Sequence, residues 1–226
     1  MASPMSISDH ADSVDAQLRK GFGPRVRKLH ARIGKAHHKA EGMAFSRALL
    51  EGQATPLQLA ALIRALVPAY ALLEQEGPAL ASALGATAIP WSDLARGSAL
   101  AHDLAALSAI GPTPASAAAA IWLEQMKVLV RQSPHRLMAH VYVRYGGDLS
   151  GGQQLAEQAN AILRRQGVPS LRFWAFEQDL PWLKQSLHDG FEQMDLSDAE
   201  EEELLEEAEL AFSATQRLLA ELADLC

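Results

Sequence analysis

Apolar side chains recur at intervals of three and four residues along most of the chain, and this spacing places them on one face of an α-helix. Between residues 25 and 51 the apolar stripe comprises Val26, Leu29, Ile33, Ala36, Ala40 and Ala44. We find no segment with the alternating apolar and polar positions of a β-strand, and no internal repeat. The pattern therefore predicts an all-α protein.

Capping signals divide this pattern into separate helices. The stretch Thr55-Pro56-Leu57-Gln58 is a capping box with a proline at the first helical position, and it predicts a helix to about residue 83. A second capping box, 197–200, predicts a last helix that runs to the C-terminus. The same signals predict further helices over residues 25–51, 90–107, 113–132, 134–163 and 170–190, the last with an interruption near Pro181.

The length of 226 residues fits one domain with a substantial core. We expect residues 1–20 to be a mobile N-terminal segment with a short helix over 11–20, and residues 21–226 to form a single all-α domain. The one cysteine, Cys226, excludes an internal disulfide framework and a cysteine-based metal site. Because neither a membrane-length apolar run nor a secretory signal is present, we expect a cytoplasmic protein without a membrane partner.

Charge is distributed unevenly along the chain, although the net charge is only −7. Residues 1–50 hold nine basic and four acidic residues, a balance of +5, whereas residues 189–226 hold one and thirteen, a balance of −12. Two solvated helix faces are the ordinary interpretation. The functional interpretation is a basic surface for anionic ligand groups or an acidic redox partner. Nucleic acid is not expected, because the basic residues are not interleaved with aromatic ones.

The stretch from Tyr142 to Gln153 contains four glycines, an aspartate and a serine. Each glycine inside a helix costs roughly 0.5–1 kcal/mol relative to alanine. A loop between two helices is one interpretation, but helical periodicity on both sides favours a helix that runs through. The apolar positions that carry this periodicity are Leu137, Val141, Tyr145, Leu155, Ala159 and Leu163. The glycines would then let the backbone approach something flat or bulky.

Residues 144–153 include Gly-Asp-Leu-Ser-Gly-Gly and closely resemble the distal-helix signature of the heme oxygenases. The resemblance extends over about residues 25–225 and implies a single-domain helical fold that holds heme between a proximal and a kinked distal helix. It implies oxidative cleavage of heme, as both substrate and cofactor, to biliverdin, carbon monoxide and ferrous iron. It further implies O2 and an external electron donor such as ferredoxin or a reductase. Biliverdin supply to a photoreceptor and recovery of iron are both compatible with it.

The stretch His37-His38-Lys39-Ala40-Glu41 is similar to the family's proximal motif. The resemblance selects His37 as the axial ligand of the heme iron, and His37 also continues the apolar stripe, whereas His38 points about 100° away. Glu41 follows one turn later, close enough to affect the imidazole of His37. A histidine without a ligand is the ordinary alternative, and His38 is the reserve candidate.

On the distal side, Gly147 and Gly151 share one helix face, and the resemblance places them against the heme and its bound oxygen. It gives Asp148 a role in delivering protons rather than in binding iron. Tyr142 and Arg144 match family positions that join this proton network.

Tyr70 is a further candidate for the same network. We count Ser150, in the same signature, among the heme-binding residues. A local hydrogen bond that bends the helix, shared by Asp148 and Ser150, is the structural alternative.

The resemblance also indicates how heme would be anchored. Lys184 matches a basic position of the family, but His188 stands where an arginine is expected one turn later. His30 lies seven residues before His37, where mammalian enzymes carry a lysine that binds a heme propionate. Phe212 matches a pocket residue of the family's last core helix. The departures leave the biliverdin isomer open.

Two other functions agree with parts of the pattern. A heme carrier or sensor would keep the pocket without turnover, although the intact Asp148 argues against it. A carboxylate di-iron bundle is suggested by Glu74 and Glu76, but it requires Glu-x-x-His pairs. Neither Glu74 nor Glu41 has a histidine three residues on. The sequence therefore favours a heme oxygenase.

Overall fold

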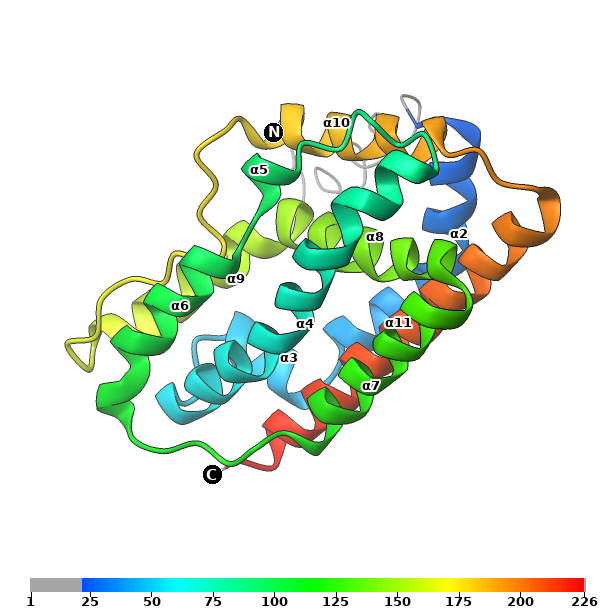
Figure 1. The fold of residues 1–226 in the computed structure, drawn as a ribbon. Helices are drawn as coiled ribbons and strands as arrows, with labels where there is room; N and C mark the ends of the chain where they lie inside the picture. The colour runs from blue at the N-terminus through cyan, green and yellow to red at the C-terminus, as the bar shows by residue number, and fades with distance from the viewer. Residues whose placement is uncertain (1–21, 226) are drawn as a thin grey trace, which may run out of the picture.

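The structure, a computed structural model, describes residues 22–225, and every regular element within them is helical (Figure 1). The short helix predicted over 11–20 and Cys226 lie outside the described residues. The elements are α2 (Pro24–Glu41), α3 (Ala44–Leu50), α4 (Pro56–Ala83), α5 (Trp91–Leu94), α6 (Gly97–Ala106), a 3₁₀ turn η1 (Leu107–Ile110), α7 (Ala117–Gln132), α8 (Pro134–Ser150), α9 (Gly152–Arg164), α10 (Leu180–Gln193) and α11 (Asp198–Ala223).

Both predicted capping boxes are present. The Thr55 hydroxyl accepts the backbone N–H of Gln58 at 3.2 Å, and the Gln58 side chain accepts the backbone N–H of Thr55 at 2.8 Å. The same exchange joins Ser197 and Glu200 at the start of α11. Each box satisfies two backbone donors that a helix start otherwise leaves without a partner. The capping boxes thereby fix where α4 and α11 begin.

The helix predicted over residues 25–51 is wrong, because it is divided in two. The backbone N–H of Gly42 returns to the His38 carbonyl at 3.1 Å and closes the last turn of α2, and Met43 is then extended with ψ 152°. The division places His37, His38 and Glu41 together on the last turn of α2. The helix predicted over 90–107 is likewise divided into α5 and α6.

Two predicted helix starts are also wrong. The helix α7 begins four residues later than expected, since the Ser116 hydroxyl accepts the N–H of Ala119 at 2.9 Å and caps it. The helix α10 begins ten residues later, because the Asp179 carboxylate accepts the N–H of Trp182 at 3.0 Å. Pro181 therefore lies in the first turn of a helix, where its missing N–H costs nothing, and does not interrupt one.

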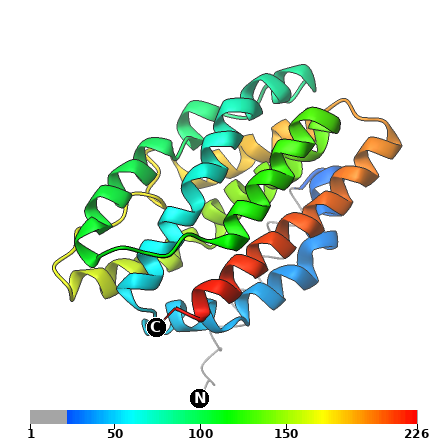
Figure 2. The same ribbon diagram turned by 60° about the horizontal axis from the view of Figure 1, so that its bottom comes forward.

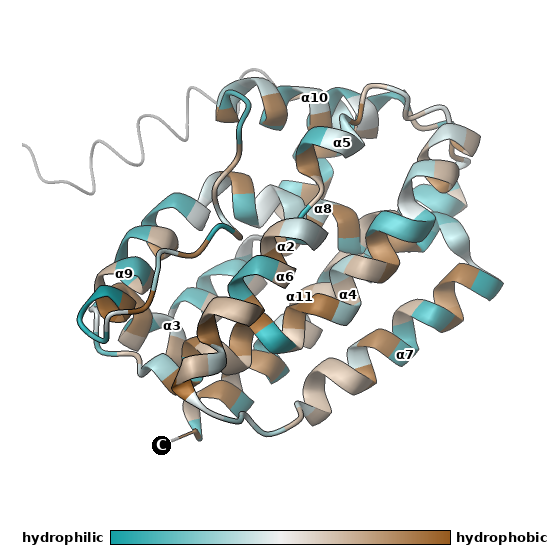
Figure 3. Ribbon diagram, turned by 60° about the vertical axis from the view of Figure 1, so that its left-hand side comes forward, coloured by the Kyte–Doolittle hydropathy of each residue, from teal (hydrophilic) through white to brown (hydrophobic). Residues whose placement is uncertain are grey.

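The helix α8 is central to the fold and packs against α4, α7, α9, α10 and α11. Figure 2 shows α11 lying alongside α2. The helix α10 contacts both α2 and α8. Turns of opposite hydropathy alternate along α7 and α10 in Figure 3, as expected for helices with one buried face. The two helices that carry the predicted heme motifs, α2 and α8, are thus held by common neighbours.

The expectation that no apolar run reaches membrane length is wrong, because α4 is long and apolar enough to cross a membrane by length and composition, the one such helix among the described residues. Its most apolar window has a mean hydropathy of 1.6, and 61% of that window is buried inside the protein. The buried side chains include Leu59, Ile63, Leu66, Tyr70 and Leu73. Burial of this kind identifies α4 as a core helix.

The glycine-rich stretch follows the path of a kinked helix, as predicted. The helix α8 ends at Ser150, and α9 begins at Gly152. The N–H of Gly151 donates to the Gly147 carbonyl at 2.9 Å, and the N–H of Leu155 donates to the Gly151 carbonyl at 3.3 Å. Helical hydrogen bonding therefore continues across the break, which lies at Gly151.

Candidate active site

His37 lies on the last turn of α2 with about half of its side chain, 53%, exposed. Its Nδ1 atom is 3.6 Å from Glu41 Oε2, and Phe212 of α11 packs edge-on against the ring with 5.9 Å between centroids. Because Nδ1 faces a carboxylate, Nε2 is the nitrogen left for a ligand. The structure therefore brings His37, Glu41 and Phe212 together.

His38 is more exposed than His37, at 83% of its side chain. Its Nδ1 atom is 3.4 Å from the same Glu41 oxygen, and its ring stands edge-on to His37 at 6.0 Å between centroids. The aromatic contact with Phe212 belongs to His37. These positions support His37 over His38 as the axial ligand.

The glycines of the signature are of two kinds. A methyl group on Gly147 would meet no heavy atom within 4 Å outside its own turn, and one on Gly151 would meet only the Gly147 carbonyl oxygen at 3.8 Å. A methyl group on Gly152 would instead lie 2.7 Å from the indole of Trp174, which is buried. Gly147, Ser150 and Gly151 are all exposed. The open glycines therefore offer an unobstructed backbone surface that suits a planar ligand such as heme, whereas Gly152 serves packing.

Asp148 is buried between α4 and α8, with 3% of its surface exposed. The Tyr70 hydroxyl donates a hydrogen bond to Asp148 Oδ2. Arg144 Nη2 lies 3.8 Å from Asp148 Oδ1, and Arg144 Nε donates to the Tyr70 oxygen at 3.3 Å. The three residues close a triangle, which we call the distal triad. It brings together three of the four residues that the sequence analysis assigns to one proton network.

Burial sets the protonation of the distal triad. It raises the pKa of Asp148, against the opposing effects of Arg144, the Tyr70 hydrogen bond and Arg96. Burial also raises the pKa of Tyr70 well above its usual value. It lowers the pKa of Arg144, but Tyr70 and Asp148 outweigh it and the pKa is raised overall. Tyr70 thus keeps its proton and Arg144 keeps its charge. Asp148 is the member of the triad whose pKa moves toward neutral pH.

A layer that the sequence analysis missed supports the distal triad. The Tyr145 hydroxyl donates to Glu74 Oε1 at 3.2 Å, and its ring stands edge-on to Tyr70 at 5.5 Å between centroids. Glu74 also accepts the backbone N–H groups of Arg96 at 2.5 Å and Gly97 at 3.2 Å. Glu74, considered above as an iron ligand, therefore anchors the start of α6. The sequence carried one signal of this layer. Tyr70 and Glu74 are four residues apart and so share one face of a helix, and Val141 and Tyr145 share a face of another in the same way.

A second buried chain of polar groups, also missed, joins α7, α8 and α11. Trp122 Nε1 donates to His140 Nδ1 at 3.0 Å, so the proton of a neutral His140 lies on Nε2, which is 3.1 Å from Glu207 Oε1. Arg136 pairs with Glu207 Oε2 at 2.8 Å. The Arg144 guanidinium lies 5.8 Å from the centroid of the Trp122 ring. This chain therefore borders the distal triad without joining it by a hydrogen bond.

Tyr142 faces α10 rather than α4. Its ring lies 5.2 Å from Phe191 and 6.2 Å from His188, measured between centroids. Among the hydrogen bonds of residues 22–225, none joins Tyr142 to Asp148. The structure thus places Tyr142 apart from the distal triad.

His188 is buried, and its ring stands edge-on to Phe22 at 4.7 Å between centroids. Burial, with the neighbouring charges of Lys184 and His30, lowers the pKa of His188 to about 4. His188 is therefore neutral near pH 7 and cannot supply the charge of the arginine that the family pattern expects. Lys184 and His30 both act on His188, so the two candidate propionate ligands lie in one neighbourhood between α10 and α2.

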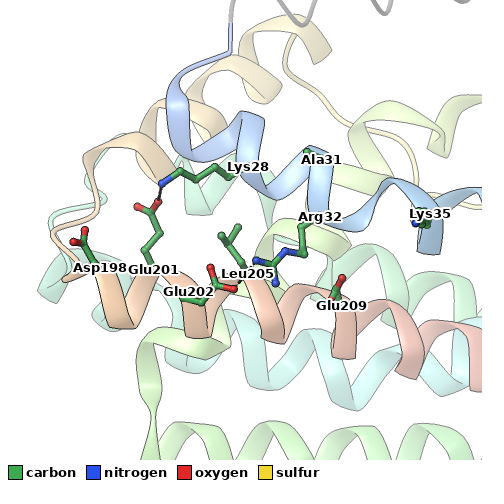
Figure 4. A pocket seen from close by; sticks show the side chains of 9 residues that line it. All are labelled: Lys28, Ala31, Arg32, Lys35, Asp198, Glu201, Glu202, Leu205 and Glu209. Atoms are coloured by element: carbon green, nitrogen blue, oxygen red, sulfur yellow. Dashed lines mark hydrogen bonds and ion pairs between the residues drawn. The ribbon is translucent and has the colours of Figure 1, made fainter.

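The two oppositely charged ends of the chain meet at a groove between α2 and α11, with a volume of about 650 Å³ (Figure 4). Lys28 pairs with Glu201, and Arg32 Nη2 lies 2.5 Å from Glu202 Oε1. Lys35 also lines the groove. Much of the basic charge of α2 is thus matched within the protein.

Residues 26–221 match the family model described as heme oxygenase. The heme oxygenase of Pyropia yezoensis is 27% identical over 196 residues, which are 83% of this chain and 81% of the relative. Heme oxygenase 1 of Pongo abelii is 30% identical over 208 residues, 84% of this chain and 69% of the relative. The heme oxygenase structure from Leptospira interrogans is 28% identical with a TM-score of 0.77, covering 85% of this chain and 97% of its own. The structure of heme oxygenase-2 from Synechocystis sp. PCC 6803, in complex with heme and NO, is 26% identical with a TM-score of 0.77, and the match covers 88% of this chain and 85% of that one.

Proposed function

Because this chain belongs to the heme oxygenase family, we propose that His37 and Gly147 mark the two faces of its heme site. The enzyme cleaves heme to biliverdin, carbon monoxide and iron. The observation that carries the assignment is the open backbone at Gly147 and Gly151, together with a half-exposed His37 whose Nδ1 faces Glu41. These residues fit heme, which is bound in a related structure.

On the proximal side, Glu41 sets the tautomer of His37. A proton on Nδ1 directed toward Glu41 Oε2, 3.6 Å away, leaves the Nε2 lone pair for iron. Phe212 limits rotation of the ring from the α11 side. When bound, heme supplies both the iron at which O2 reacts and the ring that is oxidised.

On the distal side, the protein's task is to place a proton. Asp148 can accept a proton at Oδ1 more readily than an exposed aspartate, because burial raises its pKa. Tyr70 holds Oδ2 through its hydroxyl, and Arg144 faces Oδ1, so both are positioning residues for this carboxylate. Gly147 and Gly151 leave room for heme, and Ser150 is exposed beside them. Tyr142 lies apart from the distal triad, against Phe191 and His188, and its proposed part is to border the heme from the α10 side.

Lys184 and His30 are proposed to bind the heme propionates and thereby to set which meso carbon faces the distal helix. Their common neighbour, His188, is neutral near pH 7, so it adds no charge to this end of the site. Replacing Lys184→Ala should change the ratio of biliverdin isomers, measured by chromatography, with heme binding retained. An unchanged ratio would contradict the anchoring role.

The electron donor is proposed to be an acidic protein such as ferredoxin or a reductase that docks on the exposed side of α2. Lys35 and Lys39 are exposed on either side of His37 in the sequence, whereas Lys28 and Arg32 pair with α11. Exchange of both lysines for glutamate should slow turnover driven by the protein donor but not turnover driven by ascorbate. Equal losses with both reductants would exclude this surface.

A cytoplasmic location and delivery of biliverdin to a bilin-binding photoreceptor complete the proposal. Absence of cysteine pairs within the domain suits a reducing compartment. Transfer of newly formed biliverdin to an apo-photoreceptor, followed by its absorbance, tests the delivery. Bilin that stays on the enzyme would contradict it.

The proposal is tested by heme reconstitution under anaerobic conditions, then addition of O2 and reductant, and chromatography of the bilin. Asp148→Asn should bind heme as the unmodified enzyme does but form biliverdin at least tenfold more slowly, since general acid–base groups contribute about 10²–10⁴-fold. A normal biliverdin yield from Asp148→Asn would exclude the proton role. Stable heme in the unmodified enzyme would instead favour a carrier or sensor.

A further inference from the structure

A second set of possible metal ligands surrounds His37. His37, His38 and Glu41 place three ligand atoms within 4.8 Å of one another on the last turn of α2. The Nδ1 atoms of His37 and His38 lie 3.6 and 3.4 Å from the same Glu41 oxygen. Within residues 22–225 no other group of three or more His, Cys, Asp or Glu residues has such spacing.

These separations resemble those between ligands of one transition-metal ion. Two ligands at 2.0–2.2 Å from a metal lie about 3.0 Å apart at a right angle and about 3.4 Å apart at a tetrahedral angle. The three side chains are 53%, 83% and 56% exposed, so small rotations can close the remaining difference. The C-terminal carbonyls of α2 also favour a cation at this end of the helix.

We propose that His37, His38 and Glu41 bind a divalent first-row transition ion in the heme-free enzyme, and that this ion is the ferrous iron released by heme cleavage. Two imidazoles and one carboxylate with open positions are the ligand set of many non-heme ferrous sites. The reaction frees iron beside His37 itself. The ion therefore has only to pass from Nε2 to the Nδ1 side of the same ring, exchanging ligands without any redox step.

The two uses of His37 exclude each other, a point that rests on its proposed role as the axial ligand. A neutral imidazole has one nitrogen with a lone pair and one with a proton. Heme at Nε2 requires the proton on Nδ1, and that N–H group then faces Glu41. An ion at Nδ1 requires the proton on Nε2. Heme and the ion therefore compete without occupying the same space, and each lowers the protein's affinity for the other by the same factor.

The site is tested by calorimetric titration of the full chain with Zn²⁺ and, anaerobically, with Fe²⁺. We expect one equivalent to bind to the heme-free protein and at least tenfold weaker binding to the heme-saturated protein. His38→Gln should weaken both ions at least tenfold while leaving the Soret titration with heme unchanged, and Lys39→Gln on the same turn should bind the ions as tightly as the unmodified protein. The absence of binding, or an unchanged affinity in His38→Gln, would overturn the site.

The origin of the ion is tested in a single turnover with a ferrous chelator present. If His37, His38 and Glu41 hold product iron, His38→Gln should give the ferrous chelate faster while biliverdin forms at the same rate. Equal chelation rates would overturn the assignment to product iron. If His37 is not the axial ligand, the heme spectrum of His37→Ala will match that of the unmodified protein. The Zn²⁺ titration of the unmodified heme-free protein does not depend on that result, so the two proposals can fail separately.

Discussion

The Tyr70 hydroxyl donates a hydrogen bond to Asp148 Oδ2 across the contact between α4 and α8. The two residues are 78 positions apart in the sequence, so the fold must form before the carboxylate gains its partner. Tyr70 also stands edge-on to Phe173 at 5.3 Å between centroids. The core packing of α4 thereby fixes the group that we propose to handle protons.

Removal of this hydroxyl should separate binding from turnover. In Tyr70→Phe we expect heme affinity within about twofold of the unmodified enzyme and a biliverdin rate at least tenfold lower, because Asp148 loses the donor that orients it. The control is Tyr145→Phe, which also removes a buried tyrosine hydroxyl, but one that donates to Glu74 instead of Asp148. This control should retain most of the biliverdin rate. Similar rate losses in the two variants would show a general packing effect instead.

Two glycines of the signature should respond oppositely to alanine. Gly147→Ala should raise the free energy of unfolding by about 0.5–1 kcal/mol but weaken heme binding, since its methyl group fills the open surface. Gly152→Ala should lower the free energy of unfolding, because its methyl group would lie 2.7 Å from Trp174. Urea denaturation and Soret titration measure the two effects. A stable Gly147→Ala variant with unchanged heme affinity would argue against heme lying on this face.

His188 should make stability depend on pH. Burial lowers its pKa to about 4 from an ordinary 6.5, so the unfolded chain binds more protons between these values. The contribution is fully present above about pH 6.5 and is lost as the pH falls toward 4. We expect His188→Gln to flatten the pH dependence of the free energy of unfolding over this window. Parallel curves for His188→Gln and the unmodified protein would contradict the burial of a neutral ring.

The indole N–H of Trp122 should matter for stability more than its ring volume suggests. Trp122→Phe leaves His140 Nδ1 buried without its donor, at a cost of about 1–3 kcal/mol. Trp182→Phe, whose residue is 47% exposed, is the control and should change stability by less than about 0.5 kcal/mol. Chemical denaturation distinguishes the two, and equal effects would mean that the Trp122–His140 bond contributes little.

Helix periodicity and capping residues predicted the elements well where local chemistry decides them. Both capping boxes act within four residues, so α4 and α11 begin where the sequence indicates. The wrong helix starts arose where the chain offers more than one capping signal. Ser116 and Asp179 each take a backbone N–H and start a helix later than the signals near residues 113 and 170 suggested.

The candidate site was predictable only in part, because motifs identify residues but not their partners. His37, Glu41 and Asp148 were selected from short motifs, and Phe212 was selected as a pocket position from the family resemblance, whereas its contact with His37 came from the structure. The support of Tyr145 by Glu74 had only an indirect signal, the spacing of Tyr70 and Glu74 on one helix, because the contact itself depends on how α4 crosses α8. The burial of His188 could not be found, since it depends on the contact of Phe22 with α10.

The spectrum of the heme complex of His37→Ala shows most directly whether His37 binds the heme iron. We expect this variant to lose the axial histidine signal of the ferrous heme complex in resonance Raman spectra and to regain it when free imidazole is added. His38→Ala should keep the original spectrum. A His37→Ala complex with an unchanged histidine signal, or loss of the signal in His38→Ala instead, would contradict the assignment of His37 as the iron ligand.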